Sequence, residues 1–177
     1  MIWKVPTAAG PVSIREQIEP DDEPGLLALL AACDDWFEAT TGGPSGPGDV
    51  QSLFYVLPEG RTIDDKRLFT VRHDDAIIGV IDAVVGYPHR DACAIGMFLI
   101  HPTYRREGVG TAVARTLLDE AHAISLREVT ATAVDSWPMG TAFLTALGFT
   151  VGEPSEAPMN RNIWSGEAPS RRATLTL

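Results

Sequence analysis

The segment that most constrains the fold lies between residues 95 and 124. A wholly apolar run at residues 95–100 is typical of a strand buried on both faces. The turn that follows, residues 105–111, carries two arginines and two glycines before a helix expected to begin near Gly108. N–H groups in the first turn of a helix have no intrahelical acceptor, and glycines let an oxyanion approach closely. This strand–turn–helix segment predicts a site for a phosphorylated ligand.

Two familiar phosphate motifs are excluded at this turn. No Gly-Lys-Ser/Thr follows it, so the segment is not a nucleoside-triphosphate loop. Val113 stands where a dinucleotide fingerprint has its third glycine, and no ribose-binding acid lies in the expected context. The alternative that remains is an ordinary tight turn with solvated arginines.

Two motifs further along the chain favour the ligand-binding interpretation. Arg105-x-x-Gly108-x-Gly110 after a buried strand resembles motif A of the GCN5-related N-acetyltransferases, and residues 100–104 resemble the usual lead-in to that motif. Residues 138–149, which close with Leu-Gly-Phe, resemble motif B of the same family. The resemblance extends from about Ser13 to Phe149 and is strongest after Ile77.

The resemblance implies an α/β (α+β) fold with a mixed, largely antiparallel sheet that splays apart between two central parallel strands. Acetyl-CoA is then the cosubstrate, and its pyrophosphate lies on the backbone amides of the turn. A neutral amine attacks the thioester directly, and a backbone N–H near Phe98 polarises the carbonyl. The residues implied to bind the cosubstrate are Phe98, Leu99, Ile100, Arg105, Arg106, Glu107, Gly108, Val109, Gly110, Thr111, Trp137 and Phe143.

The acid and base are harder to assign, because the chain departs from the family pattern. Leu144 follows Phe143 where motif B often has a tyrosine that protonates the leaving thiolate, and Trp137 replaces a frequent asparagine. Tyr87 could supply the missing hydroxyl if its loop folds over the site, and protonation by water is the alternative.

For the general base, Asp82 is the first candidate, because burial within the apolar run 77–82 would raise the pKa of its carboxyl. The alternative is an outward-facing residue on an alternating strand. His89 and Asp91, in the loop before the central strand, are the other candidates. Acceptor choice is expected to involve Trp36, Phe37, Tyr55 and the loop at 87–91, although core packing also explains such aromatics.

Composition excludes several classes of protein. The 177 residues, 45% hydrophobic and 21% charged, are typical of one globular domain without a membrane span or signal-peptide core. The net charge is −10 and the chain has two lysines, Lys4 and Lys66, which argues against nucleic acid. An acidic surface would favour the approach of a cationic acceptor, and solubility alone is the alternative explanation of the charge. The four histidines lack metal-ligand spacing, and Cys33 and Cys93 are expected to be reduced core thiols in a cytoplasmic protein.

Hydrophobic periodicity and turn residues place the remaining elements. The domain is assigned to residues 12–177, and residues 1–11 form an extra strand or a flexible segment. Strands are predicted at 12–18, 67–71, 76–86, 92–100, 128–134 and 172–177; helices at 21–32, around 36–37, at 50–57, 108–124 and from 138, with Ser136 as the cap of the last; and loops at 41–48 and 153–169.

These observations together predict an acyl-CoA-dependent N-acyltransferase that acts on a small-molecule or protein amine, with acetyl as the expected acyl group. Two alternatives stay open: a CoA-binding module without turnover, and an enzyme that uses another acyl-CoA. No metal is expected, and a homodimer stays open.

Overall fold

A computed structural model describes residues 1–155 and 169–177. Its centre is an eight-stranded sheet in the order β1-β2-β3-β4-β5-β6-β8-β7. Every neighbouring pair is antiparallel except β5 and β6, which are parallel. The strands are β1 (Ile2–Val5), β2 (Val12–Glu16), β3 (Lys66–His73), β4 (Ala76–Val85), β5 (Ala92–Ile100), β6 (Glu128–Val134), β7 (Thr150–Ser155) and β8 (Ser170–Thr176). The predicted mixed, largely antiparallel sheet is confirmed.

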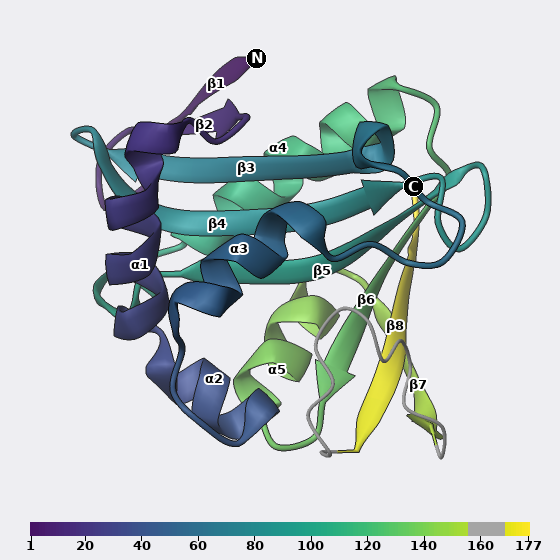
Figure 1. The fold of residues 1–177 in the computed structure, drawn as a ribbon. Coiled ribbons are helices and arrows are strands. Elements are labelled where there is room, and N and C mark those ends of the chain that lie inside the picture. Colours follow the sequence, from purple (N-terminus) through teal and green to yellow (C-terminus); the bar gives the residue numbers. More distant parts are fainter. Residues whose placement is uncertain (156–168) are drawn as a thin grey trace.

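Helices cover both faces of the sheet (Figure 1). Those described are α1 (Glu23–Ala32), α2 (Asp34–Thr41), α3 (Pro47–Tyr55), α4 (Val109–Ala123) and α5 (Pro138–Ala146), with short 3₁₀ turns η1 (Pro20–Asp22), η2 (Ile63–Asp65) and η3 (Pro102–Tyr104). In the view of Figure 1, α1 and α3 lie in front of the sheet and α4 lies behind it. No helix among the described residues combines the length and the apolar character needed to cross a membrane.

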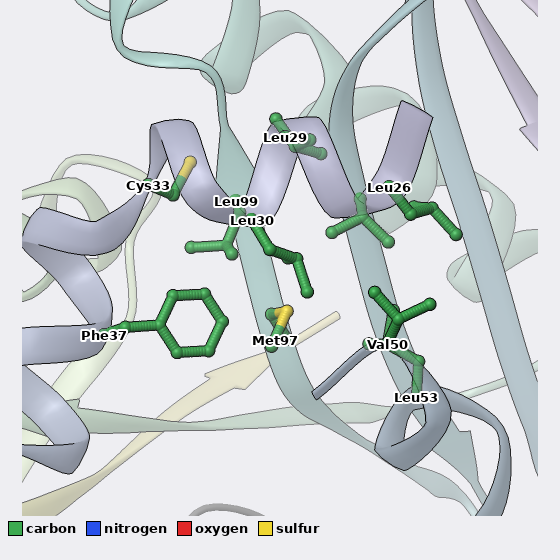
Figure 2. Close-up of a cluster of buried hydrophobic side chains, with 10 residues drawn as sticks. Leu26, Leu29, Leu30, Cys33, Phe37, Val50, Leu53, Met97 and Leu99 are labelled. Atoms are coloured by element: carbon green, nitrogen blue, oxygen red, sulfur yellow. The ribbon is translucent and has the colours of Figure 1, made fainter. Parts of the chain in front are cut away.

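The core in front of the sheet comes from the leucine-rich face of α1. Leu26, Leu29 and Leu30 recur at helical spacing, and they pack with Phe37 of α2 and Met97 of β5 (Figure 2). Val50 and Leu53 of α3 belong to the same cluster, and the predicted short helix is confirmed. Its bounds were wrong, because α3 begins at Pro47, inside the loop predicted at 41–48, and ends at Tyr55. This packing fixes the three front helices over one end of β5.

The two central strands separate along their length. β5 and β6 pair only from Ala92–Glu128 to Ile95–Ala131, although β5 continues to Ile100 and β6 to Val134. Each strand keeps its other neighbour over this stretch, because β5 stays paired with β4 and β6 with β8. The predicted splay is therefore confirmed, and among the described residues no strand pairs with the edge of β5 toward β6 beyond Ile95.

Three further predictions about elements need correction. Ser136 does not cap α5: the N-cap residue is Trp137, and the Ser136 hydroxyl donates to the Ala39 carbonyl oxygen of α2. Residues 153–155 belong to β7 rather than to a loop, and residues 156–168 of that predicted loop lie outside the described part of the chain. β2 ends at Glu16, because Gln17 takes a left-handed conformation (φ 83°) that leaves the strand.

Candidate active site

The turn before α4 presents a row of free main-chain donors. Arg106 and Gly108 both have left-handed backbones, with φ of 66° and 76°. The first amide to bond within this helix is that of Ala112, which donates to the Gly108 carbonyl oxygen at 3.0 Å. Among the described residues, no acceptor pairs with the N–H groups of residues 106–111. Since the helix dipole adds positive potential here, the turn suits an anion.

The two glycines of this turn serve different purposes. A Cβ built on Gly108 would meet nothing within 4 Å, so the space above that residue is open. A Cβ on Gly110 would lie 3.4 Å from the Phe143 ring and 3.6 Å from the Ile100 side chain. Gly108 therefore leaves room for a ligand, whereas Gly110 lets α4 pack closely against α5 and β5.

Only alternate residues of β5 direct their main-chain N–H and C=O groups toward its free edge. The His101 N–H donates to the Ile78 carbonyl oxygen at 2.8 Å, which places His101 in the ladder to β4. Because hydrogen-bonding direction alternates along a strand, the groups of Leu99 also face β4, while those of Phe98 and Ile100 face the open side. Leu99 thus has no free main-chain group, contrary to the expectation from sequence.

A β-bulge lies at the point where the strands separate. Met97 is opposite Asp82, and Ile95 is opposite Ala83, so Gly96 is the extra residue on β5. A bulge leaves main-chain groups outside the regular ladder and is frequent beside active sites. Sequence reasoning missed this feature, although a glycine inside an otherwise apolar strand is its usual signal.

The guanidinium of Arg105 already has hydrogen-bond and ion-pair partners within the protein. Its Nε donates to the Ile100 carbonyl oxygen at 2.8 Å, and its Nη1 and Nη2 donate to the Asp35 carboxylate of α2 at 2.6 and 3.3 Å. The guanidinium also lies 5.7 Å from the centre of the Trp137 ring. Burial opposes ionisation of Asp35, but hydrogen bonding and the charge of Arg105 outweigh it and lower the pKa of Asp35. Asp35 therefore neutralises Arg105, and the exposed Arg106 has no ion-pair partner among the described residues.

The motif B residues lie across the gap from the free edge. The Phe143 ring packs against the Phe98 ring with centroids 5.3 Å apart. Trp137 lies at the N-cap of α5 and faces Arg105, as above. Leu144 is buried in a separate apolar cluster, and its side chain offers no polar atom. The structure therefore brings the two predicted motifs together around the splay.

A cavity of about 1220 Å³ runs through this region. The residues that line it include Gly96, Met97 and Phe98 of β5, Phe143 of α5 and the N-cap residue Trp137, and Trp36 and Thr40 of α2. Tyr87 also lines the cavity, and its side chain is half-buried. Of the four predicted acid–base candidates, Tyr87 is the one that faces this space.

Asp82 is buried rather than outward-facing, with 2% of its surface exposed, and is ion-paired. Lys66 Nζ lies 3.0 and 3.1 Å from the two carboxylate oxygens and also donates to the Val56 carbonyl oxygen at 2.8 Å. Burial raises the pKa of Asp82 despite the nearby Lys66 charge. Asp82 is absent from the cavity lining, so the contact it makes is with Lys66 rather than with the cleft.

His89 and Asp91 lie away from the open end of the splay. His89 Nε2 is 3.0 Å from Glu128 Oε1 at the start of β6, and the Asp91 carbonyl oxygen accepts from the Arg127 N–H at 2.8 Å. Both residues precede β5, and from Ala92 to Phe98 a strand extends roughly 20 Å. The structure therefore does not bring these two candidates to the free edge of β5.

Comparison with known proteins identifies the family to which this chain belongs. The chain matches the family model described as "Acetyltransferase (GNAT) family" over residues 30–149, and it belongs to that family. Comparison with curated protein sequences returns no match. Members of the family generally use acetyl-CoA, so family and fold support acyl-CoA-dependent N-acyltransferase activity in general.

Solved structures share the fold at low sequence identity. The GNAT domain of S. lividans PAT has a TM-score of 0.73 at 14% identity, covering 99% of this chain and 97% of that chain. An acetyltransferase from Thermus thermophilus has a TM-score of 0.71 at 17% identity, covering 100% and 97%. The ribosomal-protein-S18-alanine N-acetyltransferase from Escherichia coli has a TM-score of 0.65 at 16% identity, covering 93% of each chain.

Proposed function

We propose that this chain transfers an acyl group from acyl-CoA to a primary amine by direct attack within a ternary complex. The observation that carries the proposal is the row of unpaired N–H groups at residues 106–111, which directly follows the free edge of β5. A diphosphate and a strand-like arm are the two parts of coenzyme A that these features would bind.

The pyrophosphate would accept hydrogen bonds from the amides of the turn, which include those of Arg106, Glu107, Gly108, Val109, Gly110 and Thr111. Arg106 would add the free positive charge, because it is exposed and Arg105 is neutralised by Asp35. Arg105 instead holds the end of β5 through the Ile100 carbonyl oxygen. Its role in the proposal is to position the strand and Trp137 rather than to bind phosphate.

The pantetheine arm would pair with the open main-chain groups of Phe98, since the Ile100 carbonyl oxygen is taken by Arg105. The thioester carbonyl would then lie beside the bulge at Gly96, where a backbone N–H from Gly96 to Phe98 can polarise it. Attack by the neutral amine forms the C–N bond, and the C–S bond breaks as the thiolate leaves. Most of the acceleration comes from holding the two reactants in line.

Tyr87 is the side chain that we propose to protonate the leaving thiolate, because its hydroxyl-bearing side chain lines the cavity. Asp82, by contrast, is proposed as a structural partner of Lys66, and no base is assigned to His89 or Asp91. The amine would enter the site already neutral or lose its proton through water.

The cosubstrate assignment is tested by replacing Gly108 with valine. The branched side chain would occupy the open space above the turn and reduce acetyl-CoA affinity by about 2 kcal/mol, as for lost charge-assisted hydrogen bonds. Isothermal calorimetry measures the change. Gly60→Val is the matched control, because Gly60 also has a left-handed backbone (φ 78° against 76°) and open space around it.

The two variants share the same backbone strain, so any difference in affinity comes from the site. The control should bind acetyl-CoA as the parent protein does. Equal affinity of Gly108→Val and the parent protein for acetyl-CoA would contradict the cosubstrate assignment.

A CoA-binding module without turnover is the second candidate. The observation that favours it is Leu144, a buried apolar residue at the position where the family often has a tyrosine. Release of thiol from acyl-CoA across a panel of amines decides between the two. Tight binding of acyl-CoA, with no amine raising thiol release above background hydrolysis, would favour the CoA-binding module.

A further inference from the structure

The helix behind the sheet packs tightly over its first half only. Val109 and Val113 of α4 are fully buried, and Leu117 and Ala121 on the same apolar stripe are half-buried. Ile124, the C-cap residue of the helix, is 61% exposed. Among the described residues, the second half of this stripe therefore leaves apolar surface uncovered.

The sheet presents a matching apolar surface to that half of α4. Phe69 of β3, Ile81 and Ala83 of β4 and Ile95 of β5 line the same cavity as Leu117 and Ala121. Trp3 of β1 also lines this space. The result is an apolar groove between α4 and the sheet, on the side that faces away from the viewer in Figure 1.

This groove is continuous with the proposed acyl-transfer site. The cavity that reaches Leu117 and Ile124 is the one lined by Gly96 and Phe98, where the thioester would lie. Coenzyme A itself would not fill the groove, because its pyrophosphate lies near Gly108. Leu117 is about 13 Å further along the helix, at about 1.5 Å per residue. The atoms on the acyl side of a thioester beside Gly96 and Phe98 would be the ones close enough to enter this space.

We infer that the groove between α4 and the sheet binds the acyl chain of a medium-chain acyl-CoA. The inference rests on the proposed function and goes beyond it by naming the donor. The reaction is unchanged: the amine nitrogen bonds to the carbonyl carbon, the C–S bond breaks, and the thiolate keeps the electron pair and takes the proton that the amine loses. Burial of each methylene in such a groove stabilises the complex, which an acetyl group cannot do.

The length of the groove sets the expected chain length. From Ala114 to Ile124 the helix covers about 15 Å. An extended chain of tetrahedral atoms advances roughly 1.2 Å per bond, so the groove holds about twelve bonds and suits an acyl group of up to roughly twelve carbons. A longer chain would emerge past Ile124 into solvent.

Calorimetric titration with CoA, acetyl-CoA and octanoyl-CoA tests the inference without needing the acceptor. We expect octanoyl-CoA to bind at least about tenfold more tightly than acetyl-CoA, since each buried methylene is worth up to about fourfold. Equal affinity of the two thioesters overturns the inference and leaves the proposed function intact. Failure of all three compounds to bind overturns both.

A substitution inside the groove separates specific from non-specific binding of the chain. Ala121→Phe should reduce the octanoyl-to-acetyl affinity ratio to near one by filling the space beside Leu117. Ala123→Phe is the matched control, because Ala123 is exposed on the same helix and does not line the cavity. The control should keep the ratio of the parent protein, and an equal loss in both variants contradicts the inference.

A second substitution covers the case in which Ala121→Phe does not fold. Ile124 lies at the exposed mouth of the groove, so Ile124→Glu should lower affinity for dodecanoyl-CoA more than for hexanoyl-CoA. If the thioesters bind equally and Ile124→Glu dissociates a dimer in sedimentation, the groove covers a second copy of the chain, and the inference is wrong.

Discussion

Single residues in this protein take roles that their identity does not reveal. Arg105 carries the charge expected at a phosphate site, but Asp35 and the Ile100 carbonyl oxygen occupy its guanidinium. Arg106, one position later, is exposed and has no ion-pair partner in the described part of the chain, so its charge is available to a ligand. Asp82 had the burial expected of a base, yet Lys66 lies within 3.0 Å. Partners, rather than residue type, decide what each of these side chains can do.

The Lys66–Asp82 pair leads to a stability prediction at this scale. Asp82→Asn keeps the shape of the side chain but leaves the Lys66 ammonium buried and uncompensated, which should lower the free energy of unfolding by about 3 kcal/mol. Urea denaturation measures the loss. Combining Asp82→Asn with Lys66→Met should recover most of it, because no charge then stays buried.

If the double variant is no more stable than Asp82→Asn alone, the ion pair is not the cause. An altered pH–rate profile in Asp82→Asn would instead return Asp82 to the reaction as a base.

At the scale of elements, α2 ties the two sides of the splay together. Asp35 near its start bonds to Arg105, which follows β5, and the Ala39 carbonyl oxygen near its end accepts from Ser136, which follows β6. Both bonds join residues far apart in the sequence. The width of the cleft at its open end is therefore set by one short helix rather than by the strands alone.

The Asp35–Arg105 pair gives a pH-dependent prediction. Asp35→Asn should lower the free energy of unfolding at pH 7 by about 0.5 kcal/mol, a modest value because the carboxylate is half-exposed. The pKa of Asp35 is lowered in the folded protein, so its contribution is present above the ordinary value of 3.8 and is lost as the pH falls through the folded pKa.

Thermal unfolding of the parent protein and Asp35→Asn at several pH values checks this behaviour. The two curves should differ at pH 7 and converge as the pH falls below 3.8 and through the lowered pKa of Asp35 in the folded protein. Asp34→Asn is the neighbouring control, because Asp34 bonds to Ser45 instead of Arg105. A gap that persists at low pH would contradict the assignment.

For the whole molecule, the net charge of −10 acts over distances longer than any contact. Acids are common on the front helices that border the cleft, including Asp34, Asp35 and Glu38 of α2 and Asp49 of α3. Such a field favours the approach of cations and disfavours anions. The charge of the whole molecule therefore favours a cationic acceptor amine over an anionic one.

We expect a diamine acceptor to be used more efficiently than an amino acid of similar length at low ionic strength. The ratio of their kcat/KM values should fall several-fold between about 0.01 and about 0.5 M salt, as screening shortens the reach of the field from about 30 Å to a few ångströms. Steady-state thiol release measures both. A ratio that does not change with salt would show that the charge of the whole molecule does not select the acceptor.

Sequence by itself determined the parts of this protein that depend on local order along the chain. The apolar run of β5, the turn at Gly108 and the start of α5 at Pro138 follow from periodicity and from residues with restricted or permissive backbones. Those features, with the two motifs at 105–110 and 138–149, carried the resemblance to the family, and the resemblance implied the splayed sheet.

Tertiary structure alone decided the features that depend on distant partners. The pairing of Asp35 with Arg105, of Lys66 with Asp82 and of Ser136 with Ala39 joins separate elements, and so does the groove under the second half of α4. The physical reason is that periodicity reports which face of an element is apolar, whereas packing in three dimensions decides how closely another element covers that face.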